Sequence, residues 1–115
     1  MALQGTRRQL GDVIIVDFSG KITLGEGSAT LRKTVRDLVD AGNKKILLSL
    51  YDVDYIDSSG IGELVSAYTT VKNASGELKL LHLTKRVHDI LQITRLFTVF
   101  DVQSDENTAI HSFKA

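Results

Sequence analysis

The hydrophobic pattern predicts a pair of strands near the N-terminus. Residues 13–18 form a largely β-branched apolar block between Gly11-Asp12 and Ser19-Gly20, which is typical of a strand. Gln9-Leu10 would end an earlier strand that pairs with it through a hairpin turn at Gly11-Asp12. The glycine-rich stretch 22–27 that follows predicts a flexible surface loop.

Helical and strand periodicities alternate along the rest of the chain. In order, they predict a helix at 28–41, a strand at 46–50, a helix from 61 to about 73, a strand at 78–83, a short helix opening at 84–86, a strand at 97–100 and a terminal helix at 105–113. Alternation of this kind implies right-handed crossovers and a sheet with helices packed against it. The nearly continuous apolar run 46–50 predicts a strand buried on both faces.

Asp57-Ser58-Ser59-Gly60 lies where this buried strand gives way to a helix. A helix N-terminus presents unpaired N–H groups and a partial positive charge, so a serine there can carry a phosphate at low cost. Asp, Ser and Gly are also favoured N-cap residues, and Ser59 or Gly60 with Glu63 would form a variant capping box. The two interpretations are compatible, because a capping serine can also accept a phosphate.

Composition narrows the class of protein. The 115 residues suit one domain spanning 1–115, and 43% of them are hydrophobic. Lys+Arg and Asp+Glu both number 14, which gives no sign of the basic face of a nucleic-acid binder. The lack of cysteine excludes disulfides and thiolate catalysis, and no apolar run reaches the roughly 18 residues of a membrane helix. Residues 1–8 lack an apolar signal core, so we expect a cytoplasmic protein.

Catalytic and cofactor motifs are weak. His82, His88 and His111 lack the partner four residues away that a helical metal site needs. Ser58-Ser59-Gly60 lacks the first glycine of the G-x-S-x-G nucleophile motif, so a hydrolase using Ser58 is a minor alternative. Gly25-Glu26-Gly27-Ser28 carries an acidic residue and no lysine at the helix entrance, which disfavours a phosphate-binding loop. We therefore expect neither an enzyme nor a bound cofactor or metal.

The segment Asp57-Ser58-Ser59-Gly60-Ile61-Gly62 resembles the D-S-[ST]-G-[LI]-G motif of anti-sigma factor antagonists, which belong to the STAS domain class. The resemblance covers nearly the whole chain, including the element order, the strand 46–50 and the segment 78–87. It implies an α/β STAS fold, with a mixed central sheet of about four to five strands and about four helices packed against it. It also implies a single, monomeric STAS domain over residues 1–115.

The resemblance further implies a role in a bacterial partner-switching system. In that family the serine after the Asp, here Ser58, is phosphorylated by an anti-sigma factor that is also a serine kinase. The unphosphorylated antagonist binds this partner and frees the sigma factor. Phosphorylation blocks binding, and a metal-dependent serine phosphatase restores it. Asp57 would shape the site, Ser59 would be a secondary acceptor, and Gly60 and Gly62 would permit close approach of the partner.

Partner-binding residues implied by the resemblance are Lys21, Thr23, Asp57, Ser59, Gly60, Ile61 and Gly62. Many relatives carry an acidic residue in the loop that corresponds to 20–23, where this chain has Lys21 and Thr23, so partner choice is expected to differ. The alternative is a STAS scaffold in a stress-signalling assembly, or the accessory subunit of a transport complex. Neither hypothesis involves nucleic acid or direct membrane insertion.

Overall fold

The computed structural model describes residues 3–113, in which five strands and four helices alternate. In chain order these are β1 (Gln4–Leu10), β2 (Val13–Ile22), α1 (Glu26–Asp40), β3 (Lys45–Ile56), α2 (Ser58–Asn73), β4 (Glu77–Leu81), α3 (Lys85–Ile93), β5 (Asp101–Gln103) and α4 (Glu106–Ser112). The strands form one sheet in the order β1-β2-β3-β4-β5, with β1 antiparallel to β2 and the other neighbours parallel. The predicted α/β class with a mixed sheet is confirmed.

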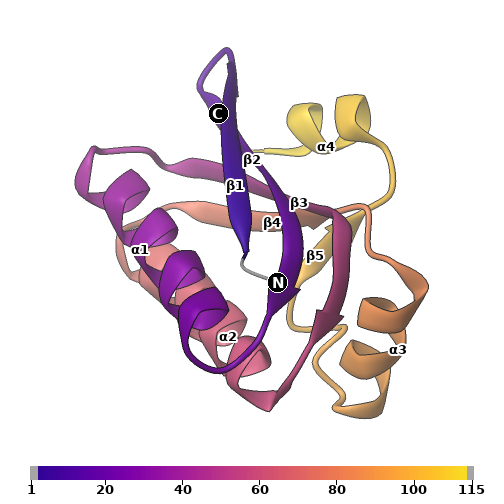
Figure 1. Cartoon of the computed structure of the whole chain (residues 1–115). Helices are drawn as coiled ribbons and strands as arrows, with labels where there is room; N and C mark the ends of the chain where they lie inside the picture. The colour runs from indigo at the N-terminus through magenta and orange to yellow at the C-terminus, as the bar shows by residue number, and fades with distance from the viewer. Residues whose placement is uncertain (1–2, 114–115) are drawn as a thin grey trace.

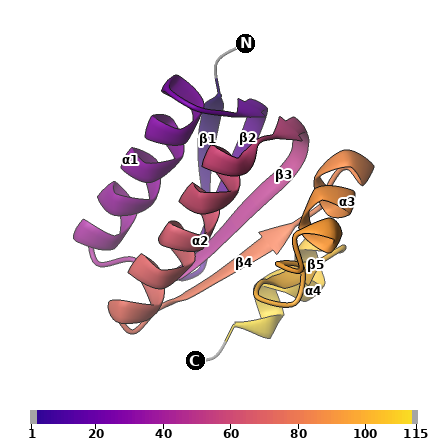
Figure 2. The same ribbon diagram turned by 90° about the horizontal axis from the view of Figure 1, so that it is seen from below.

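The helices cover the two faces of the sheet unequally. α1 and α2 lie side by side across one face (Figures 1 and 2), and α3 contributes to the same core. α4 packs on the opposite face through a smaller cluster that includes Leu47, Leu81 and Ala109. Residues 57–62, the signature turn, therefore join the central strand β3 to α2, one of the three helices of the larger core.

β3 carries the predicted apolar run through the middle of the sheet. Ile46 and Leu48 belong to the larger core, whereas Leu47 belongs to the cluster under α4. Burial on both faces is thus confirmed. The strand also continues past its predicted end, because its ladder with β2 runs on, through shifts in register, to the pair Ile22–Ile56. β3 thereby leads directly into the start of α2.

The prediction of a last strand at 97–100 is wrong. The Val99 N–H donates to the Leu96 carbonyl at 3.0 Å, so this stretch is a turn after α3. Phe100 packs edge to face on Tyr68 with ring centroids 5.8 Å apart, so an aromatic pattern that suggested a strand instead fills the core from a turn. Pairing with β4 begins only at Asp101.

Half of the predicted loop at 22–27 belongs to regular structure. β2 includes Ile22 and α1 includes Gly27, so only residues 23–25 connect them. A Cβ on Gly27 would lie 2.6 Å from the Lys21 carbonyl oxygen. The missing side chain therefore lets the first turn of α1 begin directly against the end of β2.

Arg8 of β1 links α4 to the two N-terminal strands of the sheet. Its guanidinium bonds Asp17 on β2 at 2.6 Å and Glu106 on α4 at 2.6 Å, with a second bond of 3.1 Å to each carboxylate. Bidentate pairs between an arginine and a carboxylate are directional, so they position the two side chains in addition to neutralising their charges. α4 is thus held to the two N-terminal strands although 98 positions separate Arg8 from Glu106.

Candidate functional site

Asp57 caps α2 at the carboxyl end of β3. Its backbone is extended, and its Oδ1 accepts the Gly60 N–H at 2.8 Å. The predicted N-capping of this turn is therefore confirmed, with Asp57 as the cap. The capping box with Glu63 is wrong, because that carboxylate pairs with Arg32 of α1 at 2.6 Å.

The same carboxylate reaches a second segment of the chain. Asp57 Oδ2 accepts the Leu24 N–H at 3.0 Å, and the Asp57 N–H donates to the Ile22 carbonyl at 3.2 Å. The backbone N–H groups of Gly60 and Leu24 hold the pKa of Asp57 below its usual range. Asp57 is therefore an ionised residue whose hydrogen bonds link the end of β2 and the connection after it to the start of α2.

The two serines of the motif differ in environment. Ser58 is exposed, and within residues 3–113 its hydroxyl makes no hydrogen bond. The half-buried Ser59 places its Oγ 3.1 Å from the Oγ of the buried Ser28, which donates to the Thr23 carbonyl at 2.9 Å. Ser59 is thus part of the packing between α1 and α2, whereas Ser58 faces solvent.

Gly60 and Ile61 lie inside the molecule. A Cβ on Gly60 would lie 2.0 Å from the Ile22 carbonyl oxygen, so the close approach that this glycine permits is to the chain's own β2. The Ile61 side chain is buried in the larger core. Gly62, in contrast, is exposed and has open space where a side chain would be. We therefore assign Gly60 and Ile61 to packing.

Lys21 and Thr23 lie beside this turn because β2 and β3 end together. Lys21 pairs with Tyr55 in the ladder, bonds Asp54 at 3.2 Å and lies 6.0 Å from the Tyr55 ring centroid. Arg86 of α3 lies 5.9 Å from the same centroid. The sequence-predicted residues are thus brought together at one edge of the sheet, next to the N-termini of α1 and α2 (Figure 1).

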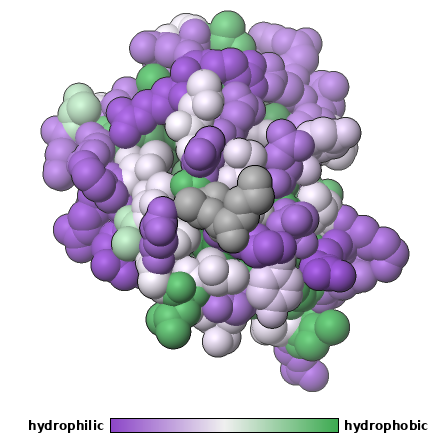
Figure 3. All heavy atoms as spheres, in the orientation of Figure 1, coloured by the Kyte–Doolittle hydropathy of each residue, from purple (hydrophilic) through white to green (hydrophobic). Residues whose placement is uncertain are grey.

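Leu24 is a feature of this edge that sequence reasoning missed. It is 78% exposed and lies in the short connection between β2 and α1. Figure 3 shows a largely hydrophilic surface with isolated hydrophobic side chains; one group is at the lower left, where Figure 1 places the start of α1, and another is at the lower right, where Figure 1 places α3. A large apolar residue inside an otherwise polar, glycine-rich stretch was the available signal.

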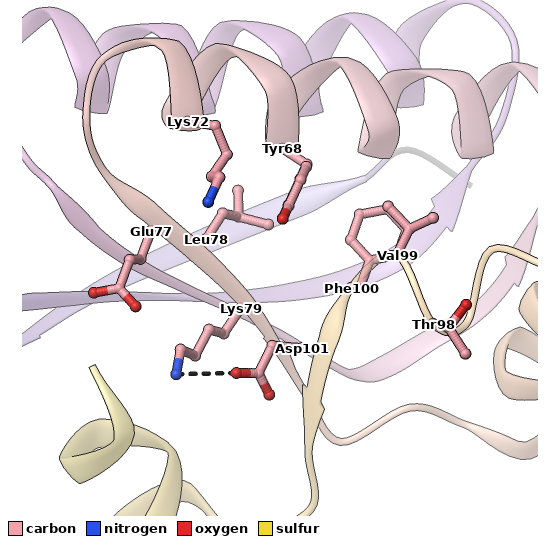
Figure 4. A pocket seen from close by; sticks show the side chains of 9 residues that line it. All are labelled: Tyr68, Lys72, Glu77, Leu78, Lys79, Thr98, Val99, Phe100 and Asp101. Atoms are coloured by element: carbon pink, nitrogen blue, oxygen red, sulfur yellow. Dashed lines mark ion pairs between the residues drawn. The ribbon is translucent and has the colours of Figure 1, made fainter. Parts of the chain in front are cut away.

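Other potential sites lie elsewhere. A hollow of about 290 Å³ opens near the far end of α2, where Lys79 bonds Asp101 at 3.0 Å (Figure 4).

His82 has a left-handed backbone with φ 55°, which ends β4 before its predicted boundary, and its ring contacts Tyr51. His88 contacts the Phe97 ring at 4.7 Å. Across residues 3–113 no three His, Cys, Asp or Glu side chains gather as metal ligands.

No helix in the described part of the chain has the length and apolar character needed to cross a membrane.

The STAS domain family model matches residues 6–109. The anti-sigma-B factor antagonist of Bacillus subtilis is 32% identical over 91 residues, which cover 79% of this chain and 82% of that protein. A candidate anti-sigma factor antagonist from Thermotoga maritima superposes with a TM-score of 0.87 at 23% identity, over 96% of this chain and 95% of its own.

The same fold also occurs in a different functional setting. A sulfate transporter family protein from Wolinella succinogenes superposes with a TM-score of 0.76 at 18% identity, over 89% of this chain and 84% of its own. At such identities a structural likeness carries the fold alone. The match of the family model over most of the chain, and the Bacillus relative, go further: this chain belongs to the STAS domain family.

Proposed function

We propose that this protein is an anti-sigma factor antagonist of a bacterial partner-switching system. In the unphosphorylated state it binds an anti-sigma factor that is also a serine kinase, and this frees the sigma factor. It acts as a monomeric cytoplasmic binding protein and a kinase substrate, with no reaction of its own. The observation that carries the proposal is the exposed, unbonded Ser58 hydroxyl at the N-terminus of α2, within the D-S-S-G-I-G motif. The similarity to the Bacillus subtilis antagonist supports it.

Ser58 is a better phosphate acceptor than Ser59 for a geometric reason. A kinase must reach the hydroxyl and deprotonate it, and Ser58 is exposed. Ser59 would first have to break its contact with Ser28 beneath the turn. A hydrolytic role for Ser58 lacks support, because within residues 3–113 no histidine bonds its hydroxyl. Failure of a fluorophosphonate probe to label Ser58 would exclude that alternative.

Phosphorylation at Ser58 would act as a local electrostatic switch. It adds about −1.5 to −2 charges near pH 7, directly beside the ionised Asp57. The α2 N-terminus offsets part of this charge within the chain, so the fold is retained. A partner surface built to cover the neutral serine meets an unpaired, desolvated dianion instead, so binding is lost. Removal of the phosphate by a metal-dependent serine phosphatase restores it.

The test begins with peptide mass spectrometry of the protein from its native cells, with and without phosphatase treatment. Ser58→Ala then serves as bait for the kinase, and calorimetry compares the affinity of the recovered kinase for wild type, Ser58→Asp and Ser59→Ala, the last of which changes the secondary candidate acceptor. We expect Ser58→Asp to bind at least about tenfold more weakly, because it buries an unpaired charge. Ser58→Asp binding as tightly as wild type, or phosphate confined to another residue, would contradict the proposal.

An accessory role in a transport complex is the second candidate, because the same fold occurs in the Wolinella transporter family protein. It predicts a chain that is never phosphorylated under growth or stress. It also predicts co-purification with a membrane transporter rather than with a soluble serine kinase. The same pull-down and mass spectrometry separate the two candidates.

A further inference from the structure

Leu24 is a highly exposed apolar side chain whose backbone is held by hydrogen bonds to the turn that carries Ser58. The side chain is 78% exposed. Its own N–H is bonded to Asp57 Oδ2 at 3.0 Å, although the two residues are 33 positions apart. The residue is thus tied directly to the turn that carries Ser58.

The neighbouring carbonyl is fixed as well. Thr23 O accepts both the N–H and the Oγ–H of Ser28, each at 2.9 Å, and Ser28 Oγ in turn contacts Ser59 Oγ at 3.1 Å. The Thr23–Leu24 peptide is therefore anchored at its N–H by Asp57 of the signature turn and at its carbonyl by Ser28 of α1. A leucine held in this way loses little backbone freedom when a partner covers it.

Rigid, solvent-exposed apolar residues beside a functional turn are suited to anchoring an interface. Interfaces obtain most of their affinity from a few side chains that enter well-packed pockets of the partner. Burying a leucine side chain is worth enough to change an affinity by about tenfold or more. Leu24 offers this contact at the same edge as Ser58, and the fold itself leaves the side chain uncovered.

We propose that Leu24 is the apolar anchor of the docking surface and that Asp57 is the residue that positions it. This inference rests on the proposed function. The partner that covers Leu24 is the anti-sigma factor/kinase, which receives the side chain in an apolar pocket. Asp57 then has a role beyond capping α2, because its second oxygen sets where Leu24 lies. A phosphate on the adjacent Ser58 would stand at the rim of that pocket, where an unpaired dianion is costly to desolvate.

The test measures affinities for the purified kinase recovered with the Ser58→Ala bait. Leu24→Ala should bind about tenfold more weakly or worse. Leu10→Ala is the matched control, because Leu10 is 44% exposed at the β1–β2 hairpin, at the opposite end of the sheet. It should bind within about twofold of wild type. Equal affinities of Leu24→Ala and wild type would overturn the inference.

Asp57→Asn separates positioning from capping. Asn is a good N-cap through one oxygen, but its amide NH₂ cannot accept the Leu24 N–H. Amide hydrogen exchange should therefore speed up at Leu24 and not at Gly60. In a double-mutant cycle the affinity loss from Asp57→Asn should shrink once Leu24 is alanine. An unchanged loss in that background would overturn the positioning role.

Failure of this inference is distinguishable from failure of the proposed function. If unphosphorylated wild type binds no serine kinase, the proposed function fails before any Leu24 variant is made. If wild type binds and Ser58→Asp does not, the function stands and the Leu24 and Asp57 variants alone decide the anchor. Thermal unfolding of each variant, with midpoints equal to wild type for both leucine changes, ensures that folded proteins are compared.

Discussion

Gly60→Ala probes how tightly the signature turn is packed against its own sheet. The new Cβ would lie 2.0 Å from the Ile22 carbonyl oxygen and 2.7 Å from Ile56 Cγ1, whereas ordinary contact begins at 3.4 Å. The start of α2 must therefore move by more than 1 Å. Overpacking of this kind costs about 1–3 kcal/mol, and disturbing the Asp57 cap adds about 1 kcal/mol.

We expect Gly60→Ala to lose about 2–4 kcal/mol of unfolding free energy in total, a large part of the 5–15 kcal/mol typical of a domain. For a chain of this size, the thermal midpoint should fall by roughly 8–16 °C. Gly62→Ala is the matched control, since its Cβ meets nothing within 4 Å. There alanine should gain about 0.5–1 kcal/mol through helix propensity.

Urea and thermal unfolding followed by circular dichroism measure both variants under the same conditions. The expected order of stability is Gly62→Ala, wild type, then Gly60→Ala. If the two alanine variants differ by less than about 1 kcal/mol, the turn accommodates a side chain and the packing argument is refuted. Binding would then be the remaining reason for a glycine at position 60.

Two further predictions concern charged groups. The N–H groups of Gly60 and Leu24 lower the pKa of Asp57 in the folded protein. The Asp57 carboxylate therefore stabilises the fold at pH values above its unfolded pKa of about 4. This stabilisation is lost as the pH falls through the folded pKa. The urea-midpoint gap between wild type and Asp57→Asn should therefore narrow from pH 7 to pH 3, and a constant gap would contradict this. Asp101→Ala leaves the Lys79 ammonium, whose side chain is 8% exposed, with its bonds to Ser112 but without a carboxylate. It should cost about 1–2 kcal/mol, more than Lys79→Met. The opposite order of urea midpoints would contradict that prediction.

The sequence was sufficient for the fold class and for the location of the signature turn, because both depend on local patterns. The apolar run at 46–50 and the helical spacing after Gly60 are properties of short windows. The last strand could not be found in that way. Asp101–Gln103 is only three residues long, with one apolar residue between two polar ones, and becomes a strand through pairing with β4. The aromatic residues at 97–100 fit a strand pattern but pack in a turn.

Leu24 could not be placed for a related reason. Its position depends on a hydrogen bond to a carboxylate 33 residues later, and no local rule reports such a bond. The role of Gly60 is similar, because only the fold brings the Ile22 carbonyl against it. Sequence reasoning thus identified the chemistry of Ser58 but not the contacts that hold its neighbours in place.

The order of the strands in the sheet has a consequence for how the chain reaches this fold. Each strand pairs with the one that precedes it in the sequence, from the β1–β2 hairpin to β5. During synthesis from the N-terminus, each new strand could therefore pair with a strand that has already been made, while the outer edge of β1 stays unpaired. The bond between Arg8 and Glu106 can form only when the last helix emerges. The strand order therefore permits the sheet to assemble in the order of synthesis, with the Arg8–Glu106 ion pair formed last.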